Sequence, residues 1–140
     1  MHVHAELRRD DSRLSCEEVE AAIADYTPKA VDPVRWSEIV GDVTVVACDA
    51  GFAKVEYLSR ALSSLSSFVT ACGGFAEVPW ELSALLTDAN VERYVVLGVQ
   101  DGLTHFTVRN RRSDLTRLMR GMRGLPRRER SAAVGRRVVG

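Results

Sequence analysis

The chain has 140 residues, of which 46% are hydrophobic and 27% are charged, and its 19 basic and 19 acidic side chains cancel. That length and hydrophobic content predict one globular domain with its own core, while three cysteines without a CxxC pair argue against a disulfide framework and a zinc ribbon. No apolar run reaches membrane-spanning length and no signal-peptide pattern opens the sequence, so we expect a soluble cytoplasmic protein with no membrane partner.

The first elements in chain order are a strand and two helices. Residues 2–8 alternate between polar and apolar side chains, which predicts a half-buried strand at a sheet edge. Ser15 and Glu18 have the spacing of a capping box, so a helix should begin there and run to about Tyr26. Asp32-Pro33 opens a second short helix, which Gly41 should end.

The middle of the chain predicts a buried strand followed by the longest helix. Residues 43–48 (VTVVAC) form a continuous β-branched run, which is typical of a central strand covered on both faces. The helix should then span about residues 52–72. Its back lacks the charges of a solvated face and is rich in serine, so we expect a second element or another subunit to cover it. These serines are Ser59, Ser63, Ser64, Ser66 and Ser67.

The last third of the chain predicts a short helix, a β-hairpin and a further helix. Apolar spacing predicts the short helix over residues 79–86. Asp101-Gly102 lies between two alternating runs, so residues 91–109 should form a hairpin with a type I′ turn. Paired residues share a face, which should bury Val95, Leu97, Phe106 and Val108 together.

A helix should follow the hairpin, and its start and apolar spacing set the fold class. Ser113 is the expected N-cap, and Asp114 follows it at the first helical position. The apolar residues at positions 115, 118, 119 and 122 should form one apolar face of the helix. The prediction is a single α+β domain over residues 1–125. It has a small mixed or antiparallel sheet of about four strands, including the 91–109 hairpin, with helices mainly on one face. Residues 126–140 should be a flexible Arg-rich tail.

Charge is unevenly distributed along the chain. Residues 1–108 hold 17 acidic and 8 basic side chains, whereas residues 109–140 hold 11 arginines and 2 acidic residues. Such separation favours a polyanionic partner or pairing of the basic end with an acidic surface. We therefore expect a non-catalytic binding or assembly protein that engages an acidic partner, with a nucleic-acid backbone as the first choice. The expected binding residues are Arg109, Arg111, Arg112, Arg117, Arg120, Arg123, Arg127, Arg128 and Arg130.

Two further classes of function stay open at this point. The chain could be a protein–protein adaptor or a homo-oligomeric subunit, because its acidic part could receive the basic end of another copy. It could also be a small enzyme that uses Cys48 and Asp49, which would lie at a strand end before a helix. His2, His4 and His105 would meet at a metal only if two predicted strands were neighbours, so we expect neither a metal site nor a cofactor.

Overall fold

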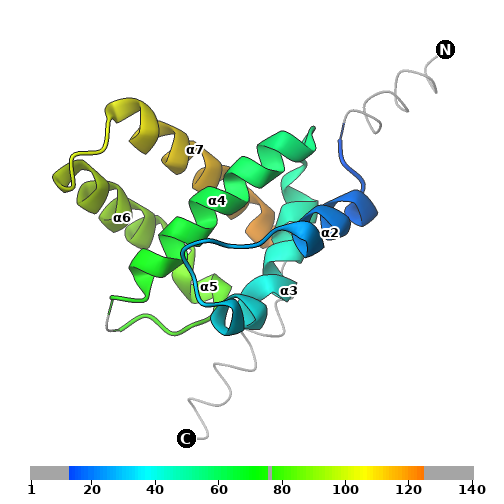
Figure 1. Ribbon diagram of the computed structural model, residues 1–140, viewed down its shortest axis with the longest axis horizontal. Coiled ribbons are helices and arrows are strands. Elements are labelled where there is room, and N and C mark those ends of the chain that lie inside the picture. The colour runs from blue at the N-terminus through cyan, green and yellow to red at the C-terminus, as the bar shows by residue number, and fades with distance from the viewer. Residues whose placement is uncertain (1–12, 76, 125–140) are drawn as a thin grey trace, which may run out of the picture.

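The computed structural model describes residues 13–75 and 77–124, and every regular element in these ranges is a helix (Figure 1). The expected α+β fold with a sheet is therefore wrong for this part of the chain. The expected strand at residues 2–8 and the tail at 126–140 lie outside the described residues. The elements are α2 (Cys16–Asp25), α3 (Pro33–Ala50), α4 (Val55–Cys72), α5 (Leu82–Leu85), α6 (Asp88–Gln100), α7 (His105–Gly121) and the 3₁₀ helix η1 (Met122–Gly124).

Helix α4 is the central element of the fold. It runs across the middle of the molecule, with α6 towards one end and α2 and α3 towards the other, while α7 runs from the α6 end to α3 (Figure 1). Helices α2, α6 and α7 all pack against it. Its buried positions, among them Leu58, Ala61, Leu65 and Phe68, form one broad face, whereas Arg60 and other polar residues are exposed on the opposite side. A broad apolar face is expected for a helix that several others cover, and the expected long helix is confirmed here.

Helix α3 replaces the short helix and the central strand expected over residues 33–48. Its start is as expected, because the Asp32 side chain accepts a hydrogen bond from the Val34 amide and Pro33 follows at the first helical position. Gly41 does not end the helix. The buried residues Trp36, Ile39, Val43, Val46 and Ala47 keep one helical spacing on both sides of it. Burial against neighbouring helices therefore outweighs the strand preference of the β-branched residues.

The predicted β-hairpin at residues 91–109 is instead a pair of helices, α6 and α7, joined by a tight turn. Gly102 has a φ of 86°, and the hairpin turn also required a positive φ there. However, the Gly102 amide donates a hydrogen bond of 3.1 Å to the Val99 carbonyl of α6. The Leu103 amide donates a hydrogen bond of 3.0 Å to the Gly98 carbonyl. These two bonds make a Schellman motif, which ends α6, and the Thr104 side chain caps the start of α7. A left-handed glycine suits both turns, so the Asp-Gly pair does not distinguish them.

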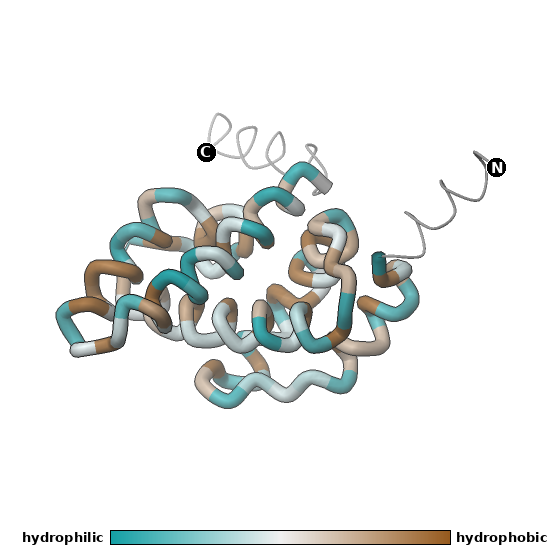
Figure 2. Tube along the Cα trace, turned by 90° about the horizontal axis from the view of Figure 1, so that it is seen from above, coloured by the Kyte–Doolittle hydropathy of each residue, from teal (hydrophilic) through white to brown (hydrophobic). Residues whose placement is uncertain are grey.

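Burial along α6 and α7 also contradicts the shared apolar face of the hairpin. Val91, Tyr94 and Gly98 are the buried residues of α6, and their spacing is helical. Leu97 is 38% exposed and Phe106 is 71% exposed, although both were expected in the core. Hydrophobic residues reach the end of the molecule where α6 and α7 meet (Figure 2). This end is therefore the least covered part of the described fold.

The remaining helices follow the sequence closely. The Ser15 and Glu18 capping box is present, with both reciprocal hydrogen bonds formed, and α2 begins where expected. The short helix expected within residues 79–86 is α5, which buries Leu82 and Leu85. Within residues 13–75 and 77–124, no helix combines the length and the apolar character that crossing a membrane requires.

Helix α7 crosses α3 at very short range. A Cβ atom built on Gly121 would lie 2.0 Å from the carbonyl oxygen of Val46, so the two backbones approach more closely than any other residue would allow. Leu115 and Leu118 are fully buried beside this crossing, as expected. Ser113 is not the N-cap, because the helix begins eight residues earlier at His105. The close approach of the two backbones requires glycine at position 121.

Candidate functional site

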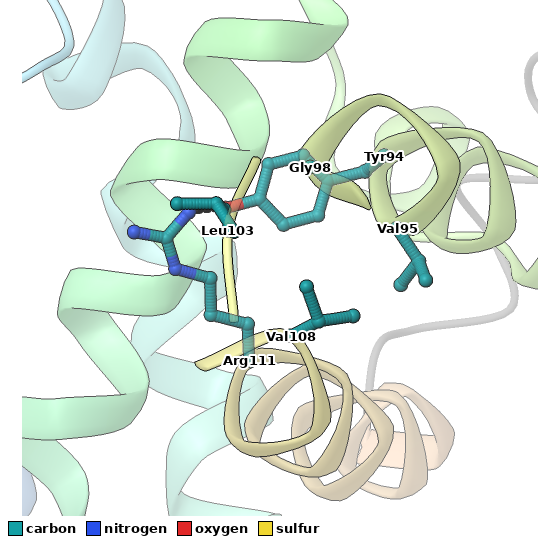
Figure 3. A pocket seen from close by; sticks show the side chains of 6 residues that line it. All are labelled: Tyr94, Val95, Gly98, Leu103, Val108 and Arg111. Atoms are coloured by element: carbon teal, nitrogen blue, oxygen red, sulfur yellow. Dashed lines mark hydrogen bonds between the residues drawn. The ribbon is translucent and has the colours of Figure 1, made fainter. Parts of the chain in front are cut away.

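The expected binding arginines of α7 fall into two groups, and the first group holds the fold together. Arg111 donates a hydrogen bond of 2.9 Å to the Tyr94 hydroxyl, and the two side chains point towards one another (Figure 3). Arg117 donates one of 3.2 Å to the Gly51 carbonyl, and its guanidinium lies 5.1 Å from the centre of the Phe52 ring. These two arginines fasten α7 to α6 and to the turn after α3, so they are less available to a partner.

The second group forms a row on the solvent side of α7 and of η1, which follows it, and we call it the arginine stripe: Arg109, Arg112 and Arg120 of α7 and Arg123 of η1. At 3.6 residues per turn the three positions in α7 fall within roughly a quarter-turn of each other, opposite Leu118. Arg112 pairs with Glu92 at 2.6 Å, but the side chains are 46% and 61% exposed, so the pair contributes little. The other three guanidinium groups have no partner among residues 13–75 and 77–124. Arg127, Arg128 and Arg130 lie outside the described residues.

The single acidic residue of α7 points away from the arginine stripe. Asp114 is 5% exposed and accepts a hydrogen bond of 2.8 Å from the Ser64 hydroxyl. Arg60 approaches its other carboxylate oxygen at 3.4 Å. Asp114 was expected to follow an N-cap at Ser113, and that prediction is wrong, because α7 begins at His105. Because its charge is buried and paired, the solvent side of α7 carries positive charge alone.

The serine-rich back of α4 is covered only in part by other elements of the same chain, so the expectation holds for three of the five serines. Ser64 bonds to Asp114 of α7, and the Ser67 hydroxyl lies 2.7 Å from the Tyr94 hydroxyl of α6. Ser66 is buried, and its hydroxyl has no hydrogen-bond partner within the described part of the chain. Ser59 and Ser63 stay exposed. The small side chains thus let α6 and α7 pack closely against α4.

A groove lies between α4 and α7, beside the contact between Ser64 and Asp114, and we call it the α4–α7 groove. It has a volume of about 250 Å³. Arg60 and Arg111 bring positive charge to it, Asp114 lies in its floor, and the exposed ring of Phe106 forms part of its wall. Its lining residues are Arg60, Ser63, Ser64, Phe106, Thr107, Asn110, Arg111 and Asp114. Sequence reasoning missed this groove, because Arg60 and Asp114 are 54 positions apart in the chain.

A second, much smaller cavity lies between α6 and α7 (Figure 3). Its volume is about 10 Å³, and apolar atoms of Val95, Leu103 and Val108 surround it. A cavity of this size and polarity has room for at most one water and gives that water few partners. It is a gap in the packing of the two helices and not a ligand site.

The structure places the proposed catalytic pair, Cys48 and Asp49, in the last turn of α3. The expected setting was a strand end before a helix, where the positive end of the helix dipole would favour a thiolate. The C-terminal end of a helix has the opposite effect. Burial, with contributions from Cys16 and Glu20, raises the pKa of the Cys48 thiol to about 12. A thiol of that pKa stays protonated at neutral pH, so the geometry does not favour nucleophilic catalysis.

The other cysteines and histidines of the described residues form no ligand set. Cys16 is exposed, whereas Cys72 is buried. Burial raises the pKa of the Cys72 thiol to about 12. His105 is an exposed residue at the start of α7, and His2 and His4 lie outside the described residues. In residues 13–75 and 77–124, no three side chains of the metal-binding types His, Cys, Asp and Glu converge.

Acidic side chains concentrate on α2 and α3, although α3 is also the helix that the C-terminal part of α7 crosses. Residues 16–50, which comprise α2 and α3, carry eight acidic and two basic side chains. Most of the acidic ones are exposed. They are Glu17, Glu18, Glu20, Asp25, Asp32, Glu38, Asp42 and Asp49. The charge separation seen along the sequence is thus also a separation between helices.

No known protein family, no curated protein and no solved structure matches this chain.

Proposed function

We propose that this protein is a non-catalytic binding protein whose arginine stripe engages an acidic partner, with a nucleic-acid backbone as the first choice. The observation that carries the proposal is the solvent side of α7. Together with η1 it presents four guanidinium groups, and the one carboxylate of α7 is buried on the opposite side. The raised pKa of the Cys48 thiol and its position at a helix C-terminus give no support to the enzyme alternative.

The shape of the stripe favours an extended anion over a small one. Arg109 and Arg120 are eleven residues apart on one helix, which corresponds to about 16 Å along the axis. Side chains in a row do not converge on one phosphate or carboxylate, as they would in a pocket for a small ligand. They can contact successive phosphates of a polymer, each contact displacing a condensed counterion.

A second candidate function rests on the acidic helices. The surface of α2 and α3 has the opposite charge to the arginine stripe, so the stripe of one copy could dock on α2 and α3 of another. This is the homo-oligomeric or adaptor function, with an acidic protein surface in place of the nucleic acid. Both candidates predict salt-sensitive binding, and they differ in what is bound.

The experiment that tests the first candidate measures binding of fluorescent oligonucleotides by anisotropy at several salt concentrations. Four phosphate contacts predict a log–log salt slope of about −3 to −4 on duplex DNA, since each contributes roughly 0.9. The double variant Arg109→Glu/Arg120→Glu should weaken binding similarly for all sequences and reduce the slope by about 2. Lys29→Glu introduces the same kind of charge change between α2 and α3, at an exposed position, and should leave binding unchanged.

Light scattering on the same samples distinguishes the second candidate. If the parent protein binds no oligonucleotide at low salt, the nucleic-acid proposal is overturned. Oligomers that dissociate in salt and are lost in the double arginine variant would then support self-assembly through α7. A monomer at every salt concentration, with no oligonucleotide bound, would contradict both candidates.

A further inference from the structure

Phe106 stands out among the residues around the arginine stripe. It is 71% exposed, more than any other large hydrophobic side chain of the described residues. It lies in the first turn of α7, three positions before Arg109, and forms a wall of the α4–α7 groove. A solvent-facing ring beside a row of cations is the combination that single-stranded nucleic acids need, because bases stack on the ring while phosphates contact the cations.

We propose that the α4–α7 groove holds one nucleotide of a single strand, with its base against Phe106 and its phosphate near Arg60, while the adjoining phosphates follow the arginine stripe. This inference rests on the proposed function and specifies its substrate class as single-stranded nucleic acid. In a duplex the bases are stacked on each other and cannot reach a side-chain ring without being extruded.

Arg60 has donors to offer such a phosphate. Its side chain is 60% exposed, and its one hydrogen bond, to Asp114, is long at 3.4 Å. The Asp114 carboxylate lies in the floor of the groove, where Ser64 also bonds to it. Together with Arg111, the charged groups of the groove sum to one positive charge, so an anion is favoured there despite the buried carboxylate.

The rest of the groove suits a polar ring of modest size. The Ser63 hydroxyl and the Asn110 amide line it, and neither side chain has a hydrogen-bond partner among residues 13–75 and 77–124. These groups can donate to and accept from the edge of a base. The volume of about 250 Å³ is below the roughly 300–1,000 Å³ of sites for larger ligands, so a single nucleotide fits better than a dinucleotide cofactor.

The test compares three labelled probes on the full chain: a single-stranded oligonucleotide, its duplex, and an abasic strand with the same number of phosphates. The parent should bind the single strand about ten-fold more tightly than the abasic strand, since one stacked base contributes roughly 5- to 150-fold. Phe106→Ala should remove that preference, whereas Phe106→Trp should retain it. Val34→Ala removes an equally exposed apolar side chain from α3 and serves as the matched control.

The outcomes separate this inference from the proposed function. If the parent binds no probe at low salt, the proposed function is overturned and this inference with it. If it binds all three probes equally, and Phe106→Ala binds as the parent does, the arginine stripe stands and the groove proposal is overturned. A nucleoside monophosphate that binds as tightly as the strand would also overturn it, because the stripe would then contribute nothing. Circular dichroism checks that each variant is folded.

Discussion

The two halves of α7 differ in how the rest of the molecule holds them. No residue of the first half, 105–113, is fully buried, whereas the second half buries Asp114, Leu115, Leu118 and Gly121. The second half meets α3 backbone to backbone at Gly121. The first half lies against α6 across the small gap shown in Figure 3.

The difference shows how one helix can serve both the core and a binding surface. Packing fixes the position of the second half, and because a helix is rigid over this length, it also fixes where the first half projects. The side chains of the first half are not needed for the core, so exposed ones such as Phe106 and Arg109 can contact a partner. The groove opens along the first half, where the contact with α4 ends.

The largest expected difference between the two halves is in the free energy of unfolding. Leu118 is fully buried, so Leu118→Ala should cost about 2–5 kcal/mol, the usual range for a core leucine. Phe106→Ala should change stability by no more than about 0.5 kcal/mol, because the ring is exposed. Chemical denaturation measures both. A hairpin at residues 91–109 would bury Phe106 and require about 3–5 kcal/mol there, so a large loss in Phe106→Ala would contradict the helical fold.

The next largest loss of stability is expected from a substitution at Gly121, where α7 crosses α3 closely. A methyl group there would lie 2.0 Å from the Val46 carbonyl oxygen, so the backbones of α3 and α7 must move apart in Gly121→Ala. The expected loss is at least the roughly 1–3 kcal/mol that overpacking costs. Gly41→Ala is the control within α3, because no atom lies within 4 Å of its added Cβ, and it should gain about 0.5–1 kcal/mol. Equal effects of the two substitutions would mean that the crossing is not tight.

Local signals in the sequence predicted where several helices begin. Ser15 and Asp32 cap helices through bonds within a few residues, and those contacts form whatever the rest of the chain does. The Thr87 cap of α6 was missed, although its side chain accepts from the Asn90 amide in the same way. A cap at Thr87, four residues before Val91, would have favoured a helix over a strand.

The sequence was ambiguous where one residue type serves two structures. Gly102 fits a hairpin turn and a helix C-terminus equally well, and the β-branched run in α3 fits a strand until Trp36 and Ile39 are included in its spacing. The division of the arginines depends on tertiary contacts. Nothing near Arg117 in the sequence indicates that it donates a hydrogen bond to the Gly51 carbonyl, while Arg120 has no partner within the part of the chain that the structure describes. The candidate groove, formed by two distant helices, was unpredictable for the same reason.

Asp114 lies at the boundary between the two halves of α7. Removing its hydrogen bond to Ser64 should lower the free energy of unfolding by a smaller amount. Ser64→Ala removes the hydroxyl that donates to the Asp114 carboxylate at 2.8 Å, leaving a buried acceptor without that donor. The expected loss of stability is about 1–3 kcal/mol. Ser63→Ala, at the exposed neighbouring position, should be within about 0.5 kcal/mol of the parent. If the two alanine variants are equally stable in urea, the floor of the groove is hydrated and Asp114 does not depend on Ser64.

The smallest expected effect is a gain, and it lies in the loosely packed half. Gly98 is inside α6 with a negative φ, so alanine is compatible with its backbone and favours the helix by up to about 1 kcal/mol. An added Cβ would lie 3.2 Å from the Leu103 Cδ1 and 3.7 Å from a methyl of Val108. The first distance is short, but it involves the end of a flexible side chain beside a small gap, so a shift of a few tenths of an ångström relieves it. Gly98→Ala should therefore raise stability by about 0.5–1 kcal/mol in the same denaturation assay, opposite in sign to Gly121→Ala. A loss as large as that of Gly121→Ala would show that α6 and α7 are packed as tightly as α3 and α7, and the contrast between the two halves would not hold.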